Sequence, residues 1–327
     1  MLRIGLNPYG LTYYLGLQGR GTPRVNPAGR GMEGFIEIAC QLNAKTIEFH
    51  NSWITGLTPP AAQSVREHIA ALGMTPVISL GPPLEGLDTA IQSALAVGAK
   101  TIRLGLSPVL CGDRNACGPQ WLEFIANARR NLHAYAPHAA ALGLVLAIEN
   151  HQDFGSQELL DFCVESGPNV GICIDTGNPL AVGEAPLEFA RRVAPLVRHV
   201  HLKDYNAQWT DEGYRLVRCA IGDGAVPFQE LATILAQHHP TLTASLEPGA
   251  LEARHVRLFR PEWWNGYAPK TAAELGPCLA AARLRRLPDD ADYRTPWERG
   301  DDAATIVQYE LDMIRRSAEN MKSLGWM

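Results

Sequence analysis

Four metal-binding side chains each stand at or near the end of a short apolar run in the second half of the chain. They are Glu149, Asp175, His201 and Glu247. Three carboxylates and one imidazole form an oxygen-rich set, which suits Mn²⁺, Mg²⁺ or Co²⁺ better than a thiolate site would. If the apolar runs are neighbouring parallel strands, the four side chains converge on one point. The sequence therefore predicts a divalent-metal site that leaves coordination positions open for substrate oxygens.

Each of these residues, taken alone, has an ordinary structural explanation. A single Glu or Asp at a strand end commonly caps a helix or joins an ion pair, and a single His is commonly a satisfied core residue. The spacing argues against four coincidences. Glu149, Asp175 and His201 follow one another at intervals of 26 residues, the length of one strand and helix, and Glu247 follows after a unit with a longer loop.

The elements that must position these side chains alternate between strand and helix. The strands are almost continuously apolar, which indicates a sheet buried on both faces. Eight such units predict an α/β fold, the (β/α)8 TIM barrel, whose catalytic residues lie at the carboxyl ends of the strands. The expected strands are 2–7, 46–50, 75–80, 101–106, 144–149, 170–175, 197–202 and 242–247. The expected helices are 33–43, 60–72, 88–97, 119–142, 157–165, 186–194, 228–238 and 303–323.

We expect one domain, in which residues 1–249 form the barrel with its active site and residues 250–327 form an extension with a loop and a closing helix. The extension contains a basic and aromatic segment, 254–264, with three arginines and the pair Trp263-Trp264. Arginines bind carboxylates and tryptophans stack on sugars, which would favour an acidic or glycosidic substrate. The alternative, which we expect, is that the tryptophans pack the extension against the barrel or a second subunit.

The composition excludes several classes of function. With 34 acidic and 29 basic residues and a net charge of -5, the chain lacks the basic surface of a nucleic-acid-binding protein. Its seven cysteines form no C-x-x-C pair, so we expect them to be reduced. Residues 1–7 lead into an expected strand without the longer apolar segment of a signal peptide, so we expect no cleaved leader. We also expect no membrane-spanning segment, because no stretch reaches the required length. We expect a cytoplasmic homo-oligomer that acts on a small polar molecule and binds no membrane.

Each candidate ligand lies within a longer motif. The four motifs are Glu149-Asn150-His151, Asp175-Thr176-Gly177-Asn178, His199-x-His201-x-Lys203-Asp204 and Leu246-Glu247-Pro248-Gly249. Together, in this order, they resemble the xylose-isomerase-like TIM-barrel superfamily, and specifically its sugar isomerase and epimerase branch. The resemblance covers residues 2 to about 249 and is strongest over 147–249.

The resemblance to ketose 3-epimerases implies a function for the four residues. In those enzymes the metal, often Mn²⁺, is held by residues that correspond to Glu149, Asp175, His201 and Glu247. The two glutamates also act as acid and base: one removes a proton beside the substrate carbonyl and the other returns a proton from the opposite face. A metal ion can stabilise the enediolate between these steps. The resemblance thus implies a metal-dependent isomerase or epimerase acting on a ketose or related keto-sugar.

Two further positions bear on the substrate. Arg218, four residues before Gly222, resembles an arginine that contacts a substrate oxygen. Asn178 departs from the epimerase pattern, which has a histidine three residues after the metal-binding aspartate. A neutral amide can orient a hydroxyl group but cannot protonate it. Ketose 3-epimerisation in particular is therefore in question.

Lys203 and His151 are the nearest substitutes for the missing histidine. Lys203 follows His201 by two residues and would reach the substrate as a cation, unless it is a rim lysine paired with Asp204. His151 lies just beyond a strand end and would contact substrate or carry a proton, unless it only hydrogen-bonds Asn150 or Asp153. Both residues are candidates for substrate binding, with Asn178 and Arg218.

Three alternatives to an isomerase stay open. A lyase on a 3-keto sugar, sugar acid or glycoside would use the same enediolate for decarboxylation, dehydration or C-glycoside cleavage. An AP endonuclease is less favoured, because it needs a three-zinc cluster with extra histidines that this chain lacks, and because the net charge is negative. A catalytically inactive binding barrel is disfavoured because both glutamates are present.

Overall fold

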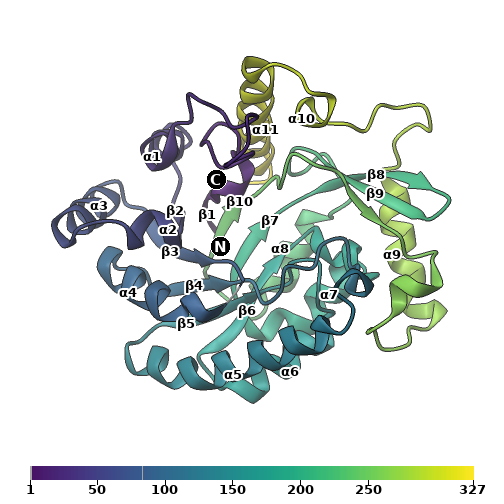
Figure 1. The fold of residues 1–327 in the computed structure, drawn as a ribbon, viewed down its shortest axis with the longest axis horizontal. Helices are drawn as coiled ribbons and strands as arrows, with labels where there is room; N and C mark the ends of the chain where they lie inside the picture. Colours follow the sequence, from purple (N-terminus) through teal and green to yellow (C-terminus); the bar gives the residue numbers. More distant parts are fainter. Residues whose placement is uncertain (1, 83) are drawn as a thin grey trace.

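A closed parallel barrel forms the centre of the molecule, as the sequence predicts. The computed structural model describes residues 2–82 and 84–327. The eight barrel strands hydrogen-bond in the order β1-β10-β7-β6-β5-β4-β3-β2 (Figure 1). Their bounds are β1 Leu2–Leu6, β2 Thr46–His50, β3 Thr75–Leu80, β4 Thr101–Leu104, β5 Val145–Glu149, β6 Val170–Asp175, β7 Val197–Leu202 and β10 Leu242–Leu246.

Helices surround the barrel and cover the outer face of its strands (Figure 1). Their apolar side chains and those of the strands form one large core cluster, which runs from Ile4 to Met321. Local sequence signals set several helix ends: prolines occupy the first turn of α3 and α7, and Gly98 ends α4 with φ +76°. The bounds are α1 Gly31–Gln41, α2 Asn51–Thr55, α3 Pro59–Ala71, α4 Leu87–Val97, α5 Gln120–Ala141, α6 Ser156–Ser166, α7 Pro186–Val193 and α8 Phe228–Ala236.

A second, three-stranded sheet lies beside the barrel and was not expected from the sequence. A hairpin of β8 (Tyr205–Thr210) and β9 (Gly213–Arg218) leaves the end of β7, and β11 (Arg254–Val256) from the extension pairs with β9. Helix α9 (Ala272–Leu284) packs against this sheet at the right of Figure 1. The extension is therefore joined to the barrel through the hairpin.

The C-terminal helix returns to the barrel. After α10 (Pro296–Arg299), α11 covers Ala303–Ser323, the span predicted for the closing helix. Buried Glu310 on α11 accepts hydrogen bonds from the backbone N–H groups of Tyr13 (3.1 Å) and Tyr14 (2.8 Å). This carboxylate fixes the loop after β1, which carries Tyr9. Among the described residues, no helix combines the length and apolarity needed to cross a membrane.

Candidate active site

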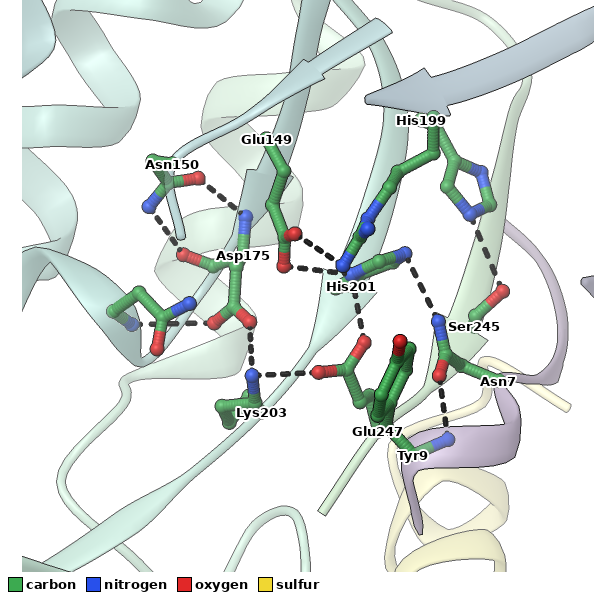
Figure 2. A network of polar contacts seen from close by, with 12 residues as sticks. Asn7, Tyr9, Glu149, Asn150, Asp175, His199, His201, Lys203, Ser245 and Glu247 are labelled. Carbon is green, nitrogen blue, oxygen red and sulfur yellow. Dashed lines mark hydrogen bonds and ion pairs between the residues drawn. The ribbon is translucent and has the colours of Figure 1, made fainter. Parts of the chain in front are cut away.

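The four predicted metal ligands meet at the carboxyl ends of β5, β6, β7 and β10. One ligand atom from each of Glu149, Asp175, His201 and Glu247 lies within 4.8 Å of the others. The strand register explains this: His201 is paired with both Asp175 and Ser245, and Glu247 follows Ser245 by two residues, so it projects to the same side. All four side chains are buried. Figure 2 shows them pointing toward one another.

Two motif residues hold the strand ends in place. The amide of Asn150 accepts a hydrogen bond from the Asp175 backbone N–H (2.6 Å) and donates one to the Asp175 carbonyl (2.9 Å) (Figure 2). The hydroxyl of Thr176 donates to the Lys203 carbonyl (2.6 Å) and accepts from the Lys203 N–H (2.8 Å). These bonds tie β5 to β6 and β6 to β7, so the ligands cannot shift independently.

The four residues form a dense buried ion-pair network with two cations. His201 Nδ1 lies 3.1 Å from Glu149 Oε1 and 2.8 Å from Glu247 Oε2. Lys203 Nζ contacts Asp175 Oδ2 (2.5 Å) and Glu247 Oε1 (2.7 Å), and Arg103 Nη2 contacts Glu149 Oε2 (2.5 Å). Buried charges need such compensation.

The charges decide the protonation states. Burial alone would raise the pKa of Glu149, but Arg103 and His201 hold that pKa well below its usual range. Burial likewise opposes a charged Lys203, yet Asp175 and Glu247 raise the pKa of its ammonium group well above normal. The pKa of Glu247 is also lowered, by Lys203 and His201 against the effect of burial. Burial raises the pKa of Asp175 to about 7, although Lys203 opposes this shift. Glu149 and Glu247 are therefore ionised at neutral pH, and a bound cation would favour the ionised form of Asp175 as well. Three carboxylates and an imidazole around one point fit a hard divalent metal with room for substrate oxygens.

A second group of ligand-type side chains, Cys173, His199 and His201, shares one histidine with the first. Burial raises the pKa of the Cys173 thiol to about 12, so this group is protonated at neutral pH. A protonated thiol is a poor metal ligand. The carboxylate set is the better candidate.

A cavity of about 340 Å³ lies beside the candidate ligands, and Glu247 is the one of the four that lines it. Glu247 and Lys203 form part of its floor, and Tyr9, Arg103, His151 and Arg254 contribute to its walls. Its volume lies at the small end of the range for ligand pockets, about 300–1,000 Å³. The cavity places three cationic side chains, Arg103, Lys203 and Arg254, next to the predicted metal site.

A protein-family comparison assigns the fold to a known group. The family model described as "Xylose isomerase-like TIM barrel" matches residues 36–257, more than half of the chain. The chain belongs to this family. The resemblance inferred from the four motifs is thereby confirmed.

Curated relatives cover only part of the chain. The uncharacterized protein YihM of Escherichia coli K12 is 30% identical over 214 residues, which span 63% of each protein. Inosose dehydratase of Bacillus thuringiensis is 30% identical over 122 residues, 32% of this chain and 40% of the dehydratase. The chain therefore matches less than two thirds of the length of either relative.

Solved structures share the fold at lower identity. A D-psicose 3-epimerase crystallised with D-fructose has a TM-score of 0.56 at 18% identity, covering 90% of this chain and 93% of the epimerase. An L-ribulose 3-epimerase has a TM-score of 0.56 at 16% identity, with 98% and 97% covered. The probable 3-DHS dehydratase AsbF of Bacillus anthracis has a TM-score of 0.50 at 16% identity, with 66% and 87% covered. Proteins that share this fold thus include two 3-epimerases and a probable dehydratase.

Two of the four predicted substrate contacts line the cavity. His151 lies in its wall; burial lowers the pKa of this imidazole to about 4, and its Nδ1 has no hydrogen-bond partner among the described residues. Asn150 and Asp153, considered as its partners, bond elsewhere: Asn150 to Asp175, and Asp153 to Ser107 Oγ (2.7 Å). A neutral imidazole with one unpaired nitrogen therefore belongs to the cavity wall.

Lys203 lies in the floor of the cavity, and its pairing with Asp204, considered as an alternative, is wrong. The Asp204 carboxylate instead accepts backbone N–H groups, including those of Gly222 (3.0 Å) and Gly224 (2.8 Å). Gly224 leaves the required space, since a Cβ there would lie 2.3 Å from Asp204 Oδ1. Asp204 thus shapes the loop after β9 and leaves Lys203 to the metal ligands.

The other two predicted contacts are not among the described residues that line the cavity. Asn178 is buried, and its Oδ1 accepts from Gln152 Nε2 (3.2 Å) and Tyr205 OH (3.4 Å). Arg218 donates to the Gly10 carbonyl (3.2 Å) and packs near α11. In this structure both side chains support neighbouring loops. Gln152 and Tyr205 line the cavity, and Asn178 holds both side chains in place by accepting their hydrogen bonds.

The segment 254–264 packs as expected. Trp263 is 2% exposed and donates its indole N–H to the Cys111 carbonyl (3.0 Å), and Trp264 donates to the Leu258 carbonyl (2.8 Å). Arg257 and Arg260 form surface ion pairs with Glu212. Only the first arginine of the segment, Arg254, reaches the cavity wall.

Sequence reasoning missed two charged residues of the site, Glu48 on β2 and Arg103 on β4. Both are buried. Burial would raise the pKa of Glu48, but the charge of His201 and hydrogen bonds from His199 and His201 lower it well below normal. The available signal was a charged residue inside an otherwise apolar strand: Glu48 lies between Ile47 and Phe49, and Arg103 between Ile102 and Leu104.

Proposed function

We propose that the protein is a divalent-metal-dependent isomerase or epimerase that acts on a ketose or related keto-sugar. One observation carries the proposal: Glu149 and Glu247 approach the same imidazole from strands on either side of β6 and β7. Two carboxylates that flank one metal position are placed to take a proton from one face of a substrate carbon and return it to the other.

Glu149, Asp175, His201 and Glu247 would hold the metal, and Mn²⁺ is the preferred ion on the strength of the family resemblance. When bound, such a cation polarises the substrate carbonyl as a Lewis acid and stabilises the enediolate. Glu247 lines the cavity and is the candidate base. Lys203, held 2.7 Å from Glu247, keeps this carboxylate ionised and compensates the charge of the oxygen that develops nearby.

The protonating group decides between reaction types. Glu149 would return the proton in an epimerase, but its ion pair with Arg103 must loosen first, because Arg103 rather than Glu149 lines the cavity. A lyase is the second candidate and is favoured by this pairing. In a lyase, Glu247 removes the proton and, once protonated, can return it to the departing hydroxyl or glycosidic oxygen. Neutral His151 lies in the wall of the same cavity and can hydrogen-bond that oxygen. The partial match to an inosose dehydratase supports this alternative.

Product analysis tests the proposal. The protein with Mn²⁺ is incubated with a panel of ketoses, keto-inositols, 3-keto sugar acids and 3-keto glycosides, and products are identified by NMR and mass spectrometry. An isomerase or epimerase yields a product of unchanged mass, whereas a lyase releases water, carbon dioxide or an aglycone. A chelator-treated sample is the control. Absence of conversion across the panel would contradict both candidates.

A further inference from the structure

Glu48 is a buried carboxylate that contacts two histidines at the base of the site. It lies in the middle of β2, across the barrel from the strands that carry the metal ligands, and is 0% exposed. Its Oε2 lies 2.9 Å from His201 Nε2 and 3.2 Å from His199 Nε2, and its Oε1 lies 3.1 Å from His201 Nε2. It therefore faces the side of His201 opposite to Glu149 and Glu247.

This contact assigns a hydrogen to Nε2 of the His201 ring. A carboxylate only accepts hydrogen bonds, so the nitrogen facing Glu48 must carry a hydrogen. The amide Nδ2 of Asn7 is also near Nε2, at 3.4 Å, but its distance is longer and both groups are donors, so this contact is not the one that fixes the ring. Without a metal, Nδ1 also faces carboxylates, so both ring nitrogens carry hydrogen. A cation bound among Glu149, Asp175 and Glu247 would replace the hydrogen on Nδ1, while the Nε2–H bond to Glu48 would remain. Nδ1 is the atom that faces Glu149 and Glu247.

We propose that Glu48 is a positioning residue that fixes the Nε2–H tautomer of His201 and thereby presents Nδ1 to the metal. The inference rests on the proposed metal site and adds a residue from the opposite side of the barrel to it. Metal-binding histidines commonly donate their second N–H to a carboxylate, which fixes the ring and strengthens the ligand.

Glu48 is itself held in place. His199 Nε2 contacts Glu48, and its Nδ1 contacts Thr243 Oγ1 at 2.7 Å, while Ser245 Oγ lies 3.2 Å from His199 Nε2. These neighbours on β7 and β10 form a buried hydrogen-bond network around the Glu48 carboxylate. Replacement of Ser245 provides a matched control, because Ser245 contacts His199 and its loss leaves the bond from His201 to Glu48 intact.

Metal titration of three variants tests the inference. Mn²⁺ is added to the metal-free protein and free Mn²⁺ is followed by EPR, with folding checked by thermal melts. We expect Glu48→Ala to bind Mn²⁺ about 10- to 100-fold more weakly than the wild type. Glu48→Gln, whose amide oxygen still accepts the Nε2–H bond, should recover part of the loss. Ser245→Ala should bind with wild-type affinity.

A second readout follows the tautomer directly. In the Zn²⁺-loaded protein with ¹⁵N-labelled histidine, the His201 signals should show a metal-bound Nδ1 and a slowly exchanging Nε2–H. That proton signal should disappear in Glu48→Ala and persist in Glu48→Gln. The assignment comes from a His201→Gln spectrum. This readout does not depend on activity or on the identity of the substrate.

The outcomes separate this inference from the proposed function. If the wild type binds metal and Glu48→Ala binds it equally tightly through the same nitrogen, the role of Glu48 is wrong and the metal site stands. Coordination through Nε2 in the wild type would also overturn it. If the wild type binds no divalent metal, the proposed function and this inference both fall.

Discussion

The ammonium nitrogen of Lys203 lies 2.5 Å from a carboxylate oxygen of Asp175, so a fixed cation already stands among the candidate metal ligands. The same nitrogen contacts Glu247 at 2.7 Å. Without a metal, this lysine compensates two of the three ligand carboxylates. A bound divalent cation would share these oxygens with Lys203 or displace it.

The Lys203→Met variant tests this relationship. Loss of the ammonium group leaves buried carboxylates uncompensated, and breaking a buried pair typically costs about 3–5 kcal/mol of stability. We therefore expect the metal-free variant to melt well below the wild type. Added Mn²⁺ should raise its melting temperature more than that of the wild type, because the metal no longer competes with a lysine. An equal metal-induced shift in both proteins would show that Lys203 and the metal do not share ligands.

Glu247 and Glu149 should differ when each is replaced by glutamine. Glu247 lines the cavity, so Glu247→Gln should lower turnover by about 10²- to 10⁴-fold. Glu149→Gln should also stop epimerisation, but it leaves the proposed base intact and should still permit proton removal. The measurement compares product formation with loss of the substrate proton to ²H₂O for each variant. If the two variants lose proton removal equally, the division of roles is wrong.

Asp153 should make stability depend on pH. Burial raises the pKa of this carboxyl from 3.8 to about 7 in the folded protein. Between pH 3.8 and about 7, the folded state holds a proton on Asp153 that the unfolded state releases. The stabilisation that comes from this proton is therefore complete below about pH 4 and is lost as the pH rises through 7. The slope is at most about 1.4 kcal/mol per pH unit. The Asp153→Asn variant should lack this part of the pH dependence.

Urea unfolding of the wild type and Asp153→Asn at pH 4.5, 6 and 7.5 provides the comparison. The other buried carboxyls are common to both proteins, so the difference between the two curves reports Asp153. The free energy of unfolding of Asp153→Asn should increase relative to that of the wild type as the pH rises. A difference that stays constant with pH would contradict the raised pKa.

Trp263 should matter for folding of the extension and not for sugar binding. It is 2% exposed and stacks on Tyr267 with ring centroids 5.0 Å apart. Trp263→Ala should destabilise the protein by about 3–5 kcal/mol, as large-to-small core changes do. The Mn²⁺ affinity of the folded variant should equal that of the wild type. A stable variant with weaker substrate binding alone would restore the stacking interpretation.

The barrel was predictable because its strands carry a local signal. The strands Thr46–His50, Thr75–Leu80, Val170–Asp175 and Val197–Leu202 have the predicted bounds, since apolar runs between turn residues mark strands buried on both faces. The strand after Lys100 ends at Leu104 rather than at residue 106. There the chain turns into the loop that lines the cavity with Gly105 and Ser107.

The second sheet escaped prediction for physical reasons. In its hairpin, β8 begins with alternating buried and intermediate residues, and β9 contains Arg215 and Arg218, so neither strand is apolar throughout. The third strand, β11, has only three residues. Helix α9 contains Pro277, which usually indicates a helix end. The alternation in Tyr205–Thr210 followed by Gly213 was the signal that could have revealed the hairpin.

The convergence of the four candidate ligands was predictable from motifs, whereas their charged partners were not. Glu48 meets His201 across 153 positions of sequence, and Arg103 meets Glu149 across the neighbouring strand. Nothing in the local sequence pairs these residues, because only closure of the barrel brings β2 opposite β7. Arg218 is the opposite case, because the resemblance suggested a substrate contact at this position. In this structure its guanidinium instead donates to the Gly10 carbonyl and holds the loop after β1.

Exchange of the substrate proton with solvent tests the central claim most directly. The claim is that a metal site and Glu247 together remove the proton beside a sugar carbonyl. With a keto-sugar found to react, the wild-type protein and Mn²⁺ in ²H₂O should place deuterium at that carbon, in recovered substrate or in product. Chelator treatment or Glu247→Gln should abolish the exchange. Turnover without any deuterium at that carbon, or exchange that persists in Glu247→Gln, would contradict the account.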